Sequence, residues 1–121
     1  MAGRARFPRS VYTRGQEPDA RFTLANERTF LAWISTGLAL LSVGVGLESL
    51  AVGLQPGFRL AASVTLILGG IACALQAWFG WMRVETALRE QRPLPASTML
   101  VVLSAVLVIT GGFVLAGLIA A

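Results

Sequence analysis

Five polar residues recur at every seventh position in one stretch of the sequence, and this spacing could support chemistry. Two are arginines, Arg21 and Arg28, and three are serines, Ser35, Ser42 and Ser49. Seven helical steps fall only about 20° short of two full turns, so a helix would place all five on one slowly drifting face. Guanidinium groups favour anions, and phosphate oxygens in particular. The pattern therefore predicts an anion-binding entrance of two arginines, followed by a polar stripe of three hydroxyls.

The same five residues also fit a plainer interpretation. Arginines beside a membrane span act as orientation anchors, and Arg28 could pair with Glu27 or with a carboxylate of a later loop. Serines within a membrane helix can bond to their own backbone or to a neighbouring helix. The pattern alone leaves both interpretations open.

Two more polar residues lie inside otherwise apolar stretches. A carboxylate in lipid is costly unless it reaches a partner, so we expect Glu48 to pair with Arg59; a role in ion conduction is the alternative. For Gln76 we expect a hydrogen bond between helices.

The sequence contains few of the residue types and motifs that catalysis uses. The chain has no histidine, no lysine and a single cysteine, Cys73. It shows no nucleophile elbow, no glycine-rich phosphate loop and no spacing of metal ligands. We therefore expect no enzymatic activity, and we predict no catalytic, cofactor-binding or metal-binding residue.

The elements that must carry the polar residues follow from hydropathy. Hydrophobic residues make up 55% of the 121 positions, charged residues 13%, and the mean hydropathy is +0.71. Each of three apolar runs, at residues 29–54, 60–82 and 98–120, is long enough for a helix to cross the roughly 30 Å hydrocarbon core. Backbone groups in lipid must be satisfied within each segment. The sequence therefore predicts an all-α integral membrane protein with three transmembrane helices.

Arginine placement predicts the orientation of these helices. Six arginines precede the first run and three follow the second, whereas the first loop has only Arg59 and the C-terminal tail has none. The positive-inside rule then places the N-terminus in the cytoplasm and the C-terminus outside. The tryptophans fit this placement, because all of them fall at the predicted cytoplasmic boundary: Trp33, Trp78 and Trp81.

The domain organisation is simple. Residues 1–18 are rich in Arg, Gly and Pro and predict a mobile basic arm, while residues 19–121 form one three-helix membrane domain. Asp19 is a candidate N-cap for the first long helix. Residues 55–59 predict a tight turn, and residues 83–89 a helix that continues beyond the membrane.

Charge and small residues suggest the partners. The net charge is +4 and the isoelectric point is about 11.1, but no nucleic-acid motif is present. Anionic lipid headgroups near the basic arm are the expected partners. The many glycines favour close helix packing and a homo-oligomer. The alternative is a non-conducting scaffold that assembles another membrane complex through the helix faces bearing Gly70 or Gly112.

Two motifs carry a family resemblance that covers residues 18–120. The first is DARFTLANERTFLAWI at residues 19–34, and the second is WMRVETALR at residues 81–89, followed by PLP at 93–95. They resemble the YidH-like small bacterial membrane proteins, which carry the domain of unknown function 202. The most specific signature residues are Asn26, Glu27, Arg28, Thr29 and Trp33.

The resemblance implies a multi-pass protein of the bacterial inner membrane with three spans. It also implies kinship with the membrane domain of the vacuolar transporter chaperone complex, in which similar units form a ring that passes polyphosphate. By that kinship Arg21 and Arg28 match basic pore-side positions, Glu27 the neighbouring acidic position, and Arg83 the basic position after the second helix. Ser35 departs from the family, which commonly has arginine there, and this weakens or shifts an anion site. The function expected is an oligomeric unit that binds or conducts phosphate or polyphosphate.

Overall fold

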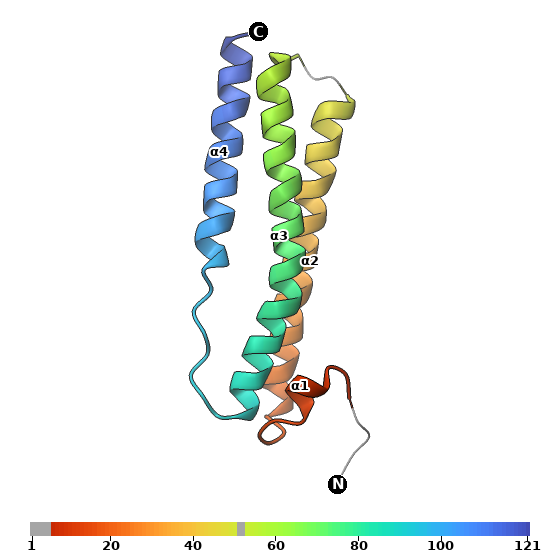
Figure 1. Cartoon of the computed structure of the whole chain (residues 1–121), viewed down its shortest axis with the longest axis vertical. Helices are drawn as coiled ribbons and strands as arrows, with labels where there is room; N and C mark the ends of the chain where they lie inside the picture. The colour runs from red at the N-terminus through yellow and green to blue at the C-terminus, as the bar shows by residue number, and fades with distance from the viewer. Residues whose placement is uncertain (1–5, 51–52) are drawn as a thin grey trace.

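The computed structural model describes residues 6–50 and 53–121, and these residues form four helices and no strand. In chain order they are α1 (Arg9–Tyr12), α2 (Ala20–Ser49), α3 (Pro56–Arg89) and α4 (Met99–Ile119). The three long helices run side by side, and α1 lies where α2 begins and α3 ends, here called the α1 end (Figure 1). All three are long and apolar enough to span a membrane. The predicted all-α fold with three spans is confirmed.

Helix α3 is central and packs against α2 through small residues. A Cβ added at Gly70 would lie 2.7 Å from Cγ of Leu41 and 2.8 Å from the carbonyl oxygen of Gly37. The two backbones therefore approach closely only because both positions are glycine. Cys73 is buried at the same interface. This use of Gly70 differs from the scaffold alternative, because its face is already covered by the chain's own α2.

Helix α4 packs closely against α3 and not against α2. A Cβ added at Gly69 would lie 2.8 Å from Val106, and Thr110 is buried on the same side of α4. The backbone N–H of Gln55 also donates to the carbonyl oxygen of Gly117 at 3.0 Å, which ties the α2–α3 connection to α4. Among the described residues no Cα atom of α2 lies within 8 Å of one of α4. Their side chains nevertheless share one hydrophobic cluster, to which α2 contributes Leu40 and α4 contributes Met99.

The helix boundaries confirm one prediction and correct another. Asp19 is the N-cap of α2, and its carboxylate accepts from the backbone N–H of Arg21 at 2.8 Å, as predicted. The tight turn expected at residues 55–59 is wrong. Pro56 is instead the first residue of α3, and the Gln55 side chain caps this helix by accepting from the N–H of Phe58. Proline suits the first helical turn because the N–H it lacks would have no intrahelical partner there.

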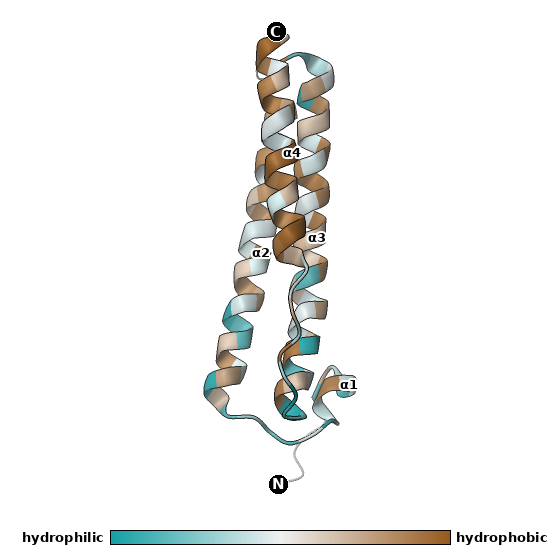
Figure 2. Cartoon of the chain, turned by 90° about the vertical axis from the view of Figure 1, so that its left-hand side faces the viewer, coloured by the Kyte–Doolittle hydropathy of each residue, from teal (hydrophilic) through white to brown (hydrophobic). Residues whose placement is uncertain are grey.

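Hydropathy separates the two ends of the bundle. Hydrophilic residues concentrate at the α1 end of α2 and α3, whereas α4 is mainly hydrophobic; a few hydrophilic residues also lie at the connection between α2 and α3 (Figure 2). Helix α3 continues to Arg89, so the predicted extension of a helix through residues 83–89 is confirmed.

The N-terminal segment differs from the expected mobile arm. We call residues 6–18 the N-terminal strap, because they fold against the end of α3. Val11 in α1 is only 1% exposed, and the N–H of Gln16 donates to the carbonyl oxygen of Arg89 at 2.8 Å. One buried apolar residue and a set of polar contacts give the strap a defined place. Residues 1–5 of the predicted arm lie outside the described residues.

The predictions for the two isolated polar residues, Glu48 and Gln76, have different outcomes. Glu48 lies 3.4 Å from Nε of Arg59, so the predicted ion pair across the connection is confirmed. The interhelical hydrogen bond predicted for Gln76 is wrong. Its side-chain oxygen accepts from Nη2 of Arg83 at 3.3 Å, two turns further along the same helix.

Candidate functional site

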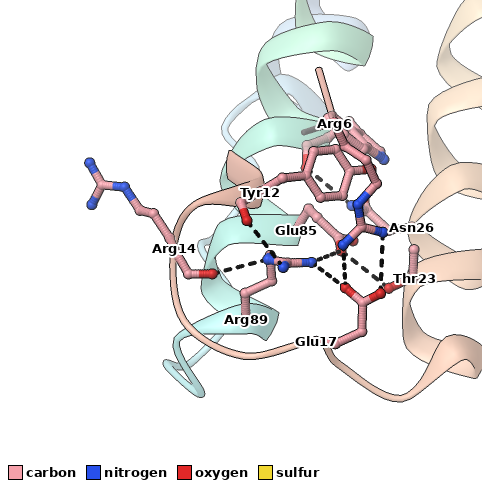
Figure 3. Close-up of polar contacts among 9 residues, drawn as sticks. Arg6, Tyr12, Arg14, Glu17, Thr23, Asn26, Glu85 and Arg89 are labelled. Atoms are coloured by element: carbon pink, nitrogen blue, oxygen red, sulfur yellow. Dashed lines mark hydrogen bonds and ion pairs between the residues drawn. The ribbon is translucent and has the colours of Figure 1, made fainter. Parts of the chain in front are cut away.

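A network of buried and charged side chains joins the strap to the α1 end of the bundle. Arg89 is only 6% exposed, and it donates to Glu17 at 2.7 Å and to the carbonyl oxygen of Arg14 at 3.0 Å (Figure 3). Arg6 donates to the same Glu17 carboxylate at 2.7 Å. These hydrogen bonds, first from Arg6 and then from Arg89, lower the pKa of Glu17 to about 2. Two guanidinium groups therefore hold one carboxylate between the strap and α3.

Glu85 lies deepest in this network. It is 1% exposed, its Oε2 accepts from the hydroxyl of Thr23 at 3.2 Å, and Nη1 of Arg89 lies 4.0 Å away. Its Oε1 has no hydrogen-bond partner among the described residues. A buried carboxylate depends strongly on its cation. Arg89 therefore serves two acidic residues, one in the strap and one in α3.

The signature residues divide into a buried part and an exposed part. Asn26 is 6% exposed, and its side-chain amide donates to the carbonyl oxygen of Trp81 at 3.1 Å, which joins α2 to α3. Trp33 packs against the small hydrophobic core of the bundle. Glu27, Arg28 and Thr29 are exposed. Part of the signature therefore holds the two helices together, and part is available for other contacts.

The predicted polar stripe lies on the outer face of α2. Its members, Arg21, Arg28, Ser35, Ser42 and Ser49, are all exposed, whereas the residues of α2 that pack on α3 occupy the opposite face. Arg21 forms an ion pair with Asp19, in which Nη2 and Oδ2 are 3.1 Å apart. We find no carboxylate partner for Arg28, and no hydrogen bond from the three serine hydroxyls, among residues 6–50 and 53–121. The stripe therefore faces lipid or another molecule and not the chain's own bundle.

A cavity of about 190 Å³ lies at the α1 end between α2, α3 and the segment before α4. Most of its wall is apolar or aromatic, and no carboxylate takes part in it. The guanidinium of Arg83 is its only charged group. The lining residues are Asn26, Thr29, Phe30, Trp33, Gln76, Ala77, Gly80, Trp81, Arg83, Val84, Pro95, Ala96, Ser97 and Leu100.

A second, more open cavity of about 540 Å³ lies between the strap, α3 and the segment after it. Arg14, Arg83 and Arg92 line it. Glu90 pairs with Arg92 at 2.7 Å and with Arg14 at 3.5 Å, so part of this charge is compensated. Arg83 borders both cavities, and its one hydrogen bond within the described chain is to the neutral side chain of Gln76. It is therefore a cation without a carboxylate at the junction of the two cavities.

The structure does not bring the three predicted anion-binding arginines together. Arg83 lines the cavities, whereas Arg21 and Arg28 are not among the lining residues and belong to the outer face of α2. The sequence interpretation missed Glu17, Glu85 and Arg89. The spacing of Glu85 and Arg89, four residues apart on a helix, is a signal for an ion pair. No local signal identifies Glu17 as the third member.

Within the described residues, no group of three or more His, Cys, Asp or Glu side chains could hold a metal ion. The charged side chains near the cavities are mainly arginines, which suit anions and not cations. The charge of these side chains is therefore of the sign that an anionic group requires.

Comparisons with known proteins agree with this architecture. Residues 21–87 match the model of the domain of unknown function DUF202. The inner membrane protein YidH of Escherichia coli K12 is 43% identical over 104 residues, which cover 84% of this chain and 89% of that protein. An uncharacterized protein of Mycobacterium tuberculosis is 40% identical over 80 residues, which cover 65% of this chain and 66% of that protein. No solved structure matches this chain significantly.

The matched region contains most of both sequence motifs, the whole of α2 from Arg21 and nearly all of α3. The similarity to YidH extends over most of the chain, and the three candidate spans agree with an inner-membrane location, as predicted. The chain therefore belongs to the DUF202 family of inner-membrane proteins.

Proposed function

We propose that this protein is an inner-membrane unit that binds phosphate-containing anions at the α1 end of its bundle, with Arg83 as the principal cation. The observation that carries the proposal is the position of Arg83. It borders two cavities, has no carboxylate partner among the described residues, and hydrogen-bonds only to Gln76. A guanidinium without a counter-ion at the edge of a membrane favours an anion from outside the chain.

Conduction of the anion would need more than one copy of the chain. The polar stripe of Arg28, Ser35, Ser42 and Ser49 faces away from α3, so a single chain does not enclose it. A homo-oligomer that placed these stripes around a shared axis would create a polar path with arginines at its mouth. The unpaired hydroxyls and Arg28 support this arrangement. The proposal is one of binding and passage, without catalysis.

Native mass spectrometry in a mild detergent with tripolyphosphate tests the binding step. We expect the wild-type protein to retain tripolyphosphate, and Arg83→Ala to weaken retention about tenfold or more, the value of a charge-assisted hydrogen bond. Arg9→Ala is the matched control, because it removes the same charge from an exposed residue outside both cavities. Equal retention by Arg83→Ala and wild type would contradict the proposal.

Flux measurements in proteoliposomes test the passage step separately. We expect Arg28→Ala to abolish anion-dependent flux while the oligomer seen by native mass spectrometry remains intact. Unchanged flux in this variant would exclude the stripe as a path. A monomer in the same spectra would exclude a ring built from it.

A non-conducting scaffold is the second candidate, and one observation favours it. Gly111 and Gly112 lie on α4 with nothing within 4 Å of an added Cβ, so this face is open to another helix. Gly112→Leu should then prevent co-purification of a defined partner complex. Recovery of the wild-type chain without any partner under mild solubilisation would argue against a scaffold.

A further inference from the structure

We infer that the 190 Å³ cavity takes the phosphate headgroup of an acidic glycerophospholipid, which enters sideways from the bilayer between α2 and α4. The inference rests on the proposed function, since it assigns the phosphate-containing ligand of Arg83 to a membrane lipid. Three properties of the cavity support the inference: its level in the bilayer, its access from the side and the composition of its wall.

The cavity lies at the level along the helices where the headgroup region of a bilayer is expected. Its wall includes the parts of the helices where charged sequence gives way to apolar sequence, just beyond Arg28 in α2 and around Arg83 in α3. Trp33 and Trp81 contribute aromatic rings to the same wall. Tryptophan is enriched at this level of membrane proteins, because its ring suits the boundary between lipid and water. A lipid phosphate would lie at the height of the guanidinium.

The side opening gives a lipid a route from the membrane. Among the described residues the backbones of α2 and α4 stay more than 8 Å apart, so no close helix packing closes this side of the cavity. Residues 95–97 and Leu100 line the cavity on this side, and Leu100 is 62% exposed. An acyl chain could follow this apolar surface from the cavity into the bilayer without leaving a hydrophobic environment.

The composition of the wall favours an amphiphile over a free, fully hydrated anion. Apolar and aromatic side chains provide most of the surface of this cavity, so a soluble polyanion would lose water here without compensation. Such an anion would reach Arg83 from the second, more open cavity. Several of the polar lining residues carry donors that suit a phosphate, among them Arg83, Gln76 and Ser97. A volume of 190 Å³ is that of about six water molecules, enough for a phosphate and the adjoining part of a glycerol.

Because no carboxylate of the described residues lines the cavity, the site should prefer an anionic headgroup over a zwitterionic one. A zwitterionic headgroup carries a cationic amine that would find no acidic partner among the lining residues. An acidic lipid such as phosphatidylglycerol has the phosphate without the amine. We therefore expect discrimination between two lipids with identical acyl chains.

Native mass spectrometry of the full chain, titrated with dioleoyl phosphatidylglycerol or dioleoyl phosphatidylcholine, tests this inference. The wild-type protein should retain phosphatidylglycerol several-fold better. Arg83→Ala should lose this preference, with about a tenfold weaker retention. Arg9→Ala, the matched loss of one exposed charge, should keep it. Equal retention of both lipids by the wild type would overturn the inference.

A second variant separates the shape of the cavity from its charge. Gly80 lines the cavity, and a Cβ added there would lie 2.5 Å from Nε2 of Gln76, so Gly80→Leu should displace the Gln76 side chain and fill the space while leaving the charge of Arg83 unchanged. Gly111→Leu is the matched control on the open face of α4. Loss of the phosphatidylglycerol preference in Gly80→Leu alone supports the cavity as the binding site. Retention of the preference in Gly80→Leu would overturn it.

Tripolyphosphate distinguishes a lipid source of the phosphate from a soluble one. If the lipid headgroup and tripolyphosphate share Arg83, tripolyphosphate should displace phosphatidylglycerol from the wild type. If tripolyphosphate binds through Arg83 but neither lipid is preferred, the ligand is soluble; the inference then fails while the proposed function stands. If neither phosphate compound depends on Arg83, both fail.

Discussion

Nη1 of Arg89 lies 2.7 Å from Oε1 of Glu17, although 72 positions separate the two residues in the chain. This ion pair joins the last residue of α3 to the N-terminal strap. It is asymmetric, because Arg89 is 6% exposed whereas the Glu17 side chain is 61% exposed. Arg89 also approaches the buried Glu85, so one side chain couples the position of the strap to the charge balance inside the bundle.

Arg89→Ala should therefore destabilise the bundle itself and not only release the strap. The variant leaves Glu85 buried without its cation, and removal of one partner of a buried pair costs about 3 kcal/mol. Arg92→Ala is the control, because its pair with Glu90 is exposed and is expected to contribute about 1 kcal/mol or less. Chemical denaturation in detergent, followed by circular dichroism, measures the difference. Equal midpoints for the two variants would show that Glu85 does not depend on Arg89.

The strap should detach when the medium becomes strongly acidic. In the folded chain the pKa of Glu17 is lowered from its ordinary 4.5 to about 2 by its hydrogen bonds with Arg6 and Arg89. Because the folded pKa is depressed, the contribution of Glu17 is fully present above pH 4.5. It is lost as the pH falls from 4.5 through 2. Protonation removes the charge that both guanidinium groups contact.

Tryptophan fluorescence can follow this detachment. Phe7 stacks on Trp78 with ring centroids 6.0 Å apart, and Tyr12 lies 6.1 Å from Trp81, so release of the strap changes the surroundings of both indoles. We expect a change in emission between pH 4.5 and 2. In Glu17→Gln, emission should already be that of the released form at pH 7 and should show no step in this range. A step of the same size in that variant would assign the effect to another group.

Those features of the fold that depend on periodicity and local chemistry could be predicted from the sequence. The three spans follow from long apolar runs, and the N-cap at Asp19 follows from the preference for short polar side chains at helix starts. The tight turn at residues 55–59 was wrong because Pro-Gly fits either a turn or a helix start. In the structure the Gln55 side chain caps α3, and Pro56 begins the helix.

The site was less predictable, because it depends on contacts between distant parts of the chain. Arg21 and Arg28 share a helical face, as the seven-residue spacing indicates, but that face points away from the cavities. Nothing in the periodicity of α2 specifies which face packs on α3. The docking of Glu17 on Arg89 likewise depends on tertiary structure, and Gly15 permits it through a positive φ of 52° against the Arg89 carbonyl.

Gly70→Ala should weaken the contact between α2 and α3. Its added methyl group would lie 2.7 Å from Cγ of Leu41 and 2.8 Å from the carbonyl oxygen of Gly37, so the two helices must move apart. Overpacking of this kind costs about 1–3 kcal/mol. Gly112→Ala is the matched control, since an added Cβ there meets nothing within 4 Å. Thermal unfolding in detergent should show a lower midpoint for Gly70→Ala alone, and equal midpoints would contradict the close approach seen here.

The orientation of the bundle in the membrane is the remaining expectation, and it decides which compartment the cavities face. Nine of the ten arginines lie before the first span or after the second, and the positive-inside rule therefore predicts that the α1 end lies in the cytoplasm. Alkaline phosphatase fused after Ala121 should therefore be active, because it folds only outside the cytoplasm. A fluorescent protein fused before Met1 should be fluorescent for the converse reason. The opposite pair of results would turn the cavities toward the outside, where Arg83 would meet periplasmic ligands instead of cytoplasmic ones.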